Sequence, residues 1–258
     1  MLHWDEFGDP AGTPVLHFHG TPGSRREAAV LDGAARAAGV RLVAPDRPGM
    51  GRTPHVPGRR LAHFPADVVE LLDALGIDRA GILAWSGGGP YALACLARIP
   101  ERLTGVALLA PAGLLPRLPW ANRLVPHLSM PLQALLARAP WGRNALAVSW
   151  REAFRQGPAG PVRDELVINE DWTGLLRPAR RASSGRSGVP VRIWHGRRDR
   201  TVPPRHSRRL SRALGAPLTD APREDHAGAL LTGGPQALRF LAAAARAQTS
   251  SKRSIPPR

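Results

Sequence analysis

Ser86 is the residue whose surroundings most clearly predict chemistry. It follows a short apolar run, residues 81–85, that is typical of a buried strand, and it precedes an Ala- and Leu-rich helical segment. A serine between a strand and a helix must adopt a sharp, strained turn. The two backbones then approach so closely that the neighbours must be small, and Ala84 and Gly88 are. This small-x-Ser-x-small pattern predicts a nucleophile elbow, with Ser86 as the nucleophile.

A serine hydroxyl needs a base to take its proton, and the base needs a partner that fixes its tautomer. With its elbow the chain resembles the α/β-hydrolase family, in which the triad residues follow the order serine, acid, histidine. Residues 195–203, HGRRDRTVP, are similar to the family's H-G-x-x-D-x-x-V-P turn at each fixed position. The resemblance implies that Asp199 orients the base. The alternative is a helix cap or a surface-turn aspartate.

The same resemblance places the base in the loop after the last strand, where His226 lies. Members of the family usually have Gly before this histidine, whereas this chain has Asp225. A neighbouring carboxylate could favour the protonated imidazole and weaken the base, which concerns the pH optimum rather than the assignment. The alternative is an exposed loop histidine.

Acyl transfer also needs N–H donors for the developing oxyanion. The residue after the nucleophile, Gly87, supplies one backbone N–H. The loop 19–23, HGTPG, resembles the oxyanion loop of prolyl iminopeptidase-like hydrolases. Because Pro22 has no N–H, Thr21 is the candidate for the second donor.

Neither a metal nor a cofactor is expected. His17 and His19 form an H-x-H pair, but no third ligand has matching spacing, so His19 is expected to support the loop. The pattern Gly49-x-Gly51 opens no helix and is similar to the family's D-R-x-G-x-G loop rather than a dinucleotide fingerprint. Residues 87–89, GGG, lack the Lys-Ser/Thr of a phosphate loop.

The elements that position these residues alternate between strand and helix. Strands are expected at 2–7, 14–18, 40–44, 81–85, 103–110, 189–194 and 216–219, and helical segments at 28–35, 66–75, 90–98, 204–214 and 235–245. This rhythm predicts an α/β fold with a mostly parallel twisted sheet that helices flank on both faces. The family usually carries one more strand upstream, so the edge hairpin is either missing or the chain starts late.

Four segments are expected along the chain. Residues 1–111 form the first part of the α/β-hydrolase core, and residues 188–246 form the second part. Between them, residues 112–187 change to helical pieces (128–139, 141–154 and 161–169) and predict an inserted helical cap, which a flexible return linker at 177–188 holds loosely. Residues 247–258 are expected to be a disordered basic tail.

The formal net charge of +16 raises the question of a nucleic-acid or membrane partner. Almost all of it is arginine, since Lys252 is the only lysine, and the arginines are scattered without interleaved aromatic residues. No specific nucleic acid and no membrane is therefore expected as a partner. The single Cys95 is expected to be a small buried side chain. With no membrane-span or secretory signal pattern, a cytoplasmic location is expected.

The residues and the resemblance together predict a serine hydrolase without a cofactor. Ser86, His226 and Asp199 form its triad, and Thr21 and Gly87 form its oxyanion hole. The Trp and Leu content of the cap favours a small, apolar ester or related acyl substrate. The same triad could serve perhydrolysis, C–C bond hydrolysis or peptide cleavage. A non-catalytic binding protein with this fold is a second alternative, and a nucleic-acid or membrane binder that uses the basic tail is a third, which only the charge supports.

Overall fold

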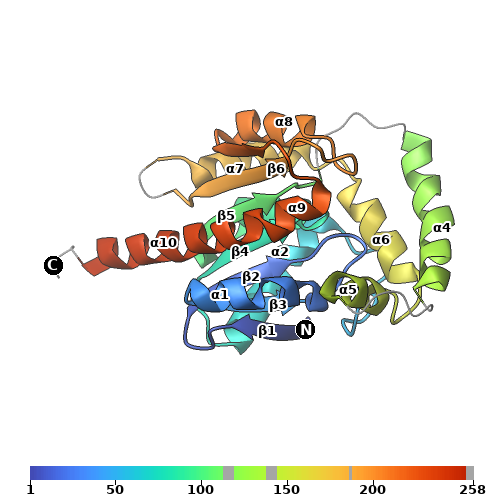
Figure 1. Ribbon diagram of the computed structural model, residues 1–258, viewed down its shortest axis with the longest axis horizontal. Helices are drawn as coiled ribbons and strands as arrows, with labels where there is room; N and C mark the ends of the chain where they lie inside the picture. Colours follow the sequence, from blue (N-terminus) through green and yellow to red (C-terminus); the bar gives the residue numbers. More distant parts are fainter. Residues whose placement is uncertain (113–118, 138–143, 186–187, 254–258) are drawn as a thin grey trace.

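Residues 1–112, 119–137, 144–185 and 188–253 are described by the structure, a computed structural model (Figure 1). Their strands form one seven-stranded sheet in the order β1-β3-β2-β4-β5-β6-β7. The strands are β1 (Trp4–Gly8), β2 (Thr13–Phe18), β3 (Val40–Pro45), β4 (Ala80–Trp85), β5 (Leu103–Leu109), β6 (Val191–Gly196) and β7 (Leu218–Ala221). Only β1 is antiparallel to its neighbour, so the predicted mostly parallel sheet is confirmed.

Helices cover both faces of this sheet. One face carries α1 (Asp32–Ala37) and α10 (Gly233–Arg253), which lie in front of the sheet in Figure 1. The other face carries α2 (Phe64–Ala74), α3 (Gly88–Arg98), α7 (Leu176–Ser183) and α8 (Arg205–Leu214). Short 3-10 turns are η1 (Arg25–Leu31), η2 (Leu61–His63), η3 (Pro100–Arg102) and η4 (Thr173–Leu175), and α9 (His226–Leu231) precedes α10.

Alternation along the strands separates the two cores. Leu16 and Phe18 of β2 pack among α2 and α3, whereas Val15 packs with Leu241 of α10. Successive side chains of a strand point to opposite faces, so a strand covered on both sides is buried on both and largely apolar. Each residue of β5, for instance, is buried. The continuous apolar runs of the sequence follow from this arrangement.

Helices α4 (Pro119–Leu136), α5 (Ala145–Ala153) and α6 (Ala159–Ile168) follow β5 and lie together at one end of the sheet (Figure 1). Helix α5 packs against η1, which follows β2, so these helices lie over the carboxyl ends of the strands. The division into core 1–111, cap 112–187 and core 188–246 stays a prediction.

The expectation of a flexible return linker is wrong for most of 177–188. Residues Leu176–Ser183 form α7, which packs against α3 and α8 and buries Ala179 completely. The arginines of this helix point away from the core, as an amphipathic helix requires, and their density obscured the apolar positions Leu176 and Ala179. Residues 186–187 lie outside the described residues.

The expectation of a disordered tail from 247 is also wrong as far as Arg253, where α10 ends. The Gln248 side chain donates a hydrogen bond of 3.0 Å to the backbone carbonyl of Thr104, at the start of β5. The helix therefore continues past its last apolar contacts, and residues 254–258 lie outside the described residues.

Candidate active site

Ser86 sits at the turn between β4 and α3 with a left-handed backbone, φ 52°. A non-glycine residue there is strained, and the strain is held by neighbours: the Ser86 N–H donates to the Leu109 carbonyl at 3.0 Å, and the Ala112 N–H donates to the Ser86 carbonyl at 2.8 Å. A Cβ on Gly88 would lie 2.2 Å from the Phe18 carbonyl oxygen of β2. The small residue that the sequence pattern demands is thus explained by backbone contact.

The structure brings Ser86, His226 and Asp199 together. The Nε2 atom of His226 lies 2.9 Å from the Ser86 Oγ, and its Nδ1 lies 2.7 Å from the Asp199 Oδ2. With a neutral imidazole, the serine O–H donates to Nε2 and the Nδ1–H donates to the carboxylate. The three side chains come from positions after β4, β6 and β7, at the edge where the parallel strands end.

Asp199 is ionised at this site, because four donors surround its carboxylate. The N–H groups of Thr201 and Val202 donate to Oδ1, at 2.9 and 2.8 Å, and Oδ2 faces His226 and also His195 Nε2, 3.2 Å away. Burial alone would raise the pKa of the Asp199 carboxyl, but the hydrogen bonds from His195, His226 and Val202 outweigh burial and hold that pKa well below its usual value.

His195 was not singled out from the sequence, although it lies four residues before Asp199 in the same turn motif. It is completely buried, its Nδ1 lies 2.6 Å from the Ser207 hydroxyl, and its Nε2 lies 2.8 Å from the Val202 carbonyl. The carbonyl can only accept, so Nε2 carries the proton and Nδ1 accepts from Ser207. Ser207 thereby fixes the tautomer in which His195 faces the acid.

Trp85 is a second residue near the candidate site for which the sequence indicated no functional role. It was interpreted only as part of the apolar strand at residues 81–85. Its indole ring lies against the His226 imidazole with centroids 4.9 Å apart, and its Nε1–H donates to the His226 carbonyl at 3.1 Å. The residue before Ser86 therefore holds both the ring and the backbone of the histidine.

Asp225, the departure from the family pattern, caps a helix. Its Oδ1 accepts a hydrogen bond of 2.8 Å from the Gly228 N–H at the start of α9, and its side chain is exposed. An N-cap carboxylate satisfies an otherwise unpaired backbone donor. The residue thus has a local role in placing His226, the first residue of α9.

The two candidate oxyanion donors, Thr21 and Gly87, lie side by side. A Cβ on Gly87 would be 3.3 Å from the Thr21 backbone nitrogen. Among the described residues, neither N–H has a hydrogen-bond acceptor. Two free backbone donors beside a candidate nucleophile are suited to binding a developing negative charge.

The loop that carries Thr21 rests on buried polar side chains. The Glu27 carboxylate accepts from the Gly20 N–H at 3.1 Å and lies 2.8 Å from His17 Nε2. His19 donates from Nδ1 to the Gly20 carbonyl at 2.7 Å, and burial and the Arg47 charge hold the His19 pKa well below its usual value. The expected support by His19 is therefore observed.

No metal site is found in the part of the chain that the structure describes, where no three His, Cys, Asp or Glu side chains are placed to hold an ion. The H-x-H pair His17 and His19 is engaged in the loop contacts given above.

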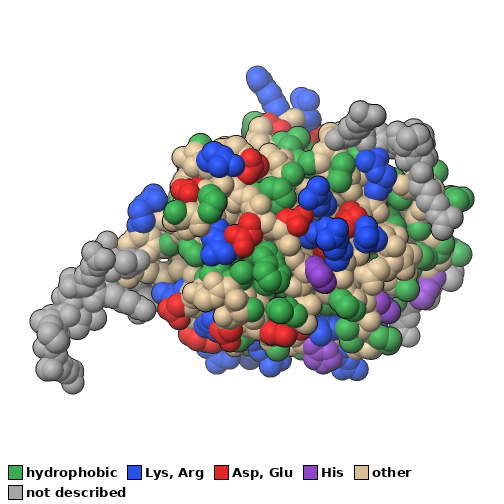
Figure 2. Space-filling view, turned by 90° about the horizontal axis from the view of Figure 1, so that it is seen from below, with side chains coloured by type: hydrophobic (Ala, Val, Ile, Leu, Met, Phe, Trp, Pro, Cys, Tyr) green, Lys and Arg blue, Asp and Glu red, His purple; other side chains and the backbone are tan. Residues whose placement is uncertain are grey.

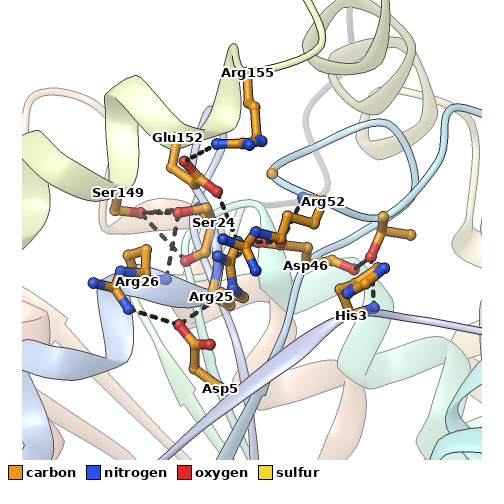
Figure 3. Close-up of polar contacts among 12 residues, drawn as sticks. His3, Asp5, Ser24, Arg25, Arg26, Asp46, Arg52, Ser149, Glu152 and Arg155 are labelled. Atoms are coloured by element: carbon orange, nitrogen blue, oxygen red, sulfur yellow. Dashed lines mark hydrogen bonds and ion pairs between the residues drawn. The ribbon is translucent and has the colours of Figure 1, made fainter.

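Helix α5 is anchored to the core by a buried ionic cluster (Figure 3). The Arg25 guanidinium contacts the carboxylates of Asp46 at 2.7 Å and Glu152 of α5 at 2.9 Å. Beside it, the Ser149 hydroxyl of α5 accepts from the Ser24 N–H at 2.9 Å. These contacts contradict the expectation of a loosely held cap for α5.

Cys95 is completely buried in α3, as expected, and burial raises the pKa of its thiol. On the face drawn in Figure 2, Lys and Arg side chains are interspersed with acidic and apolar ones. None of the described helices combines the length and the apolar character that crossing a bilayer requires.

Comparison with known proteins identifies the family to which this fold belongs. Residues 13–147 match the sequence model of the alpha/beta hydrolase fold family. Among curated relatives, the chain is 35% identical over 97 residues to the uncharacterized hydrolase YcgS of Bacillus subtilis, covering 38% of this chain and 34% of that protein. It is 30% identical over 111 residues to the proline iminopeptidase of Neisseria gonorrhoeae, covering 42% and 36%. The match thus spans only about a third of each relative's length.

Solved structures agree over nearly the whole chain. An esterase from Exiguobacterium antarcticum has a TM-score of 0.75 at 15% identity and covers 95% of both chains. The enol-lactonase from Burkholderia xenovorans LB400 has a TM-score of 0.73 at 20% identity, over 94% of this chain and 95% of that one. At such identity the likeness concerns the fold. Since the family match covers more than half of the 258 residues, the chain belongs to the α/β hydrolase fold family.

Proposed function

We propose that this protein is a serine hydrolase that cleaves a small ester or related acyl compound through an acyl-enzyme. The observation that carries the proposal is the position of His226 Nε2, 2.9 Å from the Ser86 hydroxyl, with Asp199 on the other ring nitrogen. This geometry lets one imidazole take the serine proton and later return it to the leaving group.

In the first step the Ser86 Oγ attacks the carbonyl carbon while its proton passes to His226. The carbonyl oxygen becomes an oxyanion, which the Thr21 and Gly87 N–H groups bind. Asp199 stays ionised and stabilises the imidazolium. Collapse of the intermediate expels the alcohol, which takes the proton from His226. Water then repeats the sequence on the acyl-enzyme, releasing the acid and restoring Ser86.

The proposal of an apolar acyl or alcohol group rests on the Trp and Leu content of residues 112–187. Part of the apolar surface of α4, α5 and α6 is used for packing. Met130, Ala153, Phe154 and Val162 of the cap helices cluster around Met50, in the loop after β3. The tryptophans support it less than the sequence suggested, because Trp150 is partly buried against this cluster and Trp172 is buried in the main core. The side chains of Trp120 and Trp141 lie outside the described part of the structure.

Activated esters of graded acyl length test the proposal. The wild-type protein is expected to hydrolyse them, and Ser86→Ala is expected to lower kcat by on the order of a millionfold, going by the precedent of subtilisin. Unchanged hydrolysis by Ser86→Ala would rule out the mechanism. A peptide with N-terminal proline and a substrate with a cleavable C–C bond, run on the same preparations, separate the ester proposal from the other reactions of this triad.

A further inference from the structure

The carboxylate of Asp164, on α6 of the cap, reaches the loop that carries the candidate oxyanion donor. Asp164 is 3% exposed. Its Oδ2 accepts a hydrogen bond of 2.6 Å from the Thr21 hydroxyl, and its Oδ1 accepts one of 2.7 Å from the Tyr91 hydroxyl of α3. One side chain of the cap therefore joins the oxyanion loop to the helix that follows the nucleophile.

Arg47 completes this cluster from the loop after β3. It has no exposed surface, and it holds the Asp164 carboxylate with Nε and Nη2, at 2.9 and 2.8 Å. The same guanidinium donates to three successive loop residues, namely the carbonyls of His19 and Gly20 and the Thr21 hydroxyl at 2.7 Å. The loop is thus bound residue by residue to one side chain, which the cap carboxylate fixes in turn.

The charges of the cluster are balanced. Burial would lower the pKa of Arg47, but the Asp164 carboxylate outweighs burial and raises it. Burial and the Asp164 charge raise the pKa of Tyr91 well above its usual value, so Tyr91 remains a neutral donor. An unpaired carboxylate near the site would repel an oxyanion; paired with Arg47, Asp164 contributes little net field there.

We propose that Asp164 is a positioning residue that fixes the Thr21 peptide, so that the cap sets the geometry of the oxyanion hole. The Thr21 hydroxyl donates to Asp164 and accepts from Arg47, both in charge-assisted hydrogen bonds. The peptide that carries the Thr21 N–H is also held at its other end, because the Gly20 carbonyl accepts from Arg47 at 3.0 Å. Turning this peptide would break that bond and strain the two hydroxyl bonds. This inference rests on the proposed serine hydrolase function.

The first test removes the hydroxyl and keeps the peptide donor. Thr21→Val is nearly isosteric, whereas Thr21→Ser retains both hydrogen bonds. For ester hydrolysis we expect Thr21→Val to lower kcat about tenfold or more, because a donor shifted from its place stabilises the transition state less, with KM within about twofold. Thr21→Ser should keep at least about ten times the kcat of the valine variant. Equal kcat in the two variants would overturn the proposal.

The second test changes the cap. Asp164→Asn keeps the shape of the side chain, and Glu165→Gln is the matched control on the same helix, where the Glu165 side chain accepts from Asn169 at 3.0 Å. Asp164→Asn should lower kcat and the control should not. In the double variant with Thr21→Val, the two losses should combine less than additively, because Asp164 acts through Thr21. Independent, additive losses would contradict this.

Amide hydrogen exchange of residues 19–25 gives a readout that needs no activity. We expect faster exchange in this loop for Asp164→Asn than for wild type or Glu165→Gln, with α10 unchanged. Exchange equal to that of the control would overturn the positioning role. If the wild type hydrolyses no ester, the proposed function fails, and the exchange comparison decides the positioning proposal alone. Should Asp164→Asn not fold, the Thr21 pair decides it.

Discussion

Gly87 follows the proposed nucleophile, and replacing it with alanine tests how closely the oxyanion loop packs against it. A Cβ there would lie 2.2 Å from the Thr21 Oγ1 and 2.9 Å from the Thr21 Cβ. Real contacts between such atoms are more than about 3 Å, so the loop must retreat by roughly 1 Å. The hydroxyl cannot simply rotate aside, because Asp164 and Arg47 hold it.

Two magnitudes follow for Gly87→Ala. Overpacking of this kind costs about 1 to 3 kcal/mol of the free energy of unfolding. A retreat of the Thr21 peptide by about 1 Å misplaces an oxyanion donor, and a misplacement of that size lowers kcat roughly 100-fold. The loss of stability and the fall in kcat both come from the clash between the new Cβ and the Thr21 side chain. Removing that side chain should therefore remove most of the effect of Gly87→Ala on each.

The assay combines denaturant unfolding with ester hydrolysis. Gly33→Ala is the matched control, because a Cβ on Gly33, in α1, meets nothing within 4 Å. It should leave kcat unchanged and stabilise the fold slightly, since alanine is the better helix former. In a Thr21→Gly background, which lacks both crowded atoms, Gly87→Ala should cost far less stability than in the wild type. Equal costs in the two backgrounds, or no cost in the wild type, would refute the reasoning.

Three further predictions concern the residues around the triad. Trp85→Phe removes the N–H donated to the His226 carbonyl, worth about 0.5 to 1.5 kcal/mol, so kcat should fall by up to about tenfold with the fold intact; an unchanged kcat would contradict the holding role. Because the Asp199 pKa is lowered in the folded state, its carboxylate stabilises the fold above about pH 4, and this contribution is lost as pH falls below that. The stability gap between wild type and Asp199→Asn in denaturant unfolding should therefore shrink from pH 6 to pH 3, whereas a constant gap would oppose it. Ser149→Ala leaves the buried Ser24 N–H unpaired and should cost about 1 to 3 kcal/mol of unfolding free energy, and a neutral result would show that α5 is not anchored there.

The sequence predicted the sheet because its central strands β4 and β5 are nearly continuous buried apolar runs. A strand covered on both faces, such as β5, gives a continuous apolar run in the sequence, which differs from the mixed sequence of a surface segment. Helix α7 and the end of α10 were missed for the opposite reason. Their arginines and short polar residues resemble linker and tail sequence, and the few contacts that order them, such as Ala179 in the core and Gln248 on Thr104, are tertiary.

The candidate site also contains residues that the sequence predicted and residues that it did not. Ser86, Asp199 and His226 were found because strand ends and motif order place them, and the structure brings them within hydrogen-bond distance. No motif or strand end in the sequence indicated Asp164, because its partners Thr21 and Arg47 lie more than a hundred residues away in the chain. Burial of the Asp164–Arg47 pair depends on how helix α6 packs, and the types of residue along the chain do not predict that packing.

The most direct measurement of the central claim is covalent trapping of the nucleophile. The wild-type protein is incubated with a fluorophosphonate, digested, and mapped by mass spectrometry, with His226→Ala and Ser86→Ala treated in parallel. A single adduct on the Ser86 hydroxyl, formed much more slowly in His226→Ala and absent in Ser86→Ala, is the expected result. Absence of the adduct from folded wild-type protein, or equal labelling rates with and without the imidazole, would contradict the account.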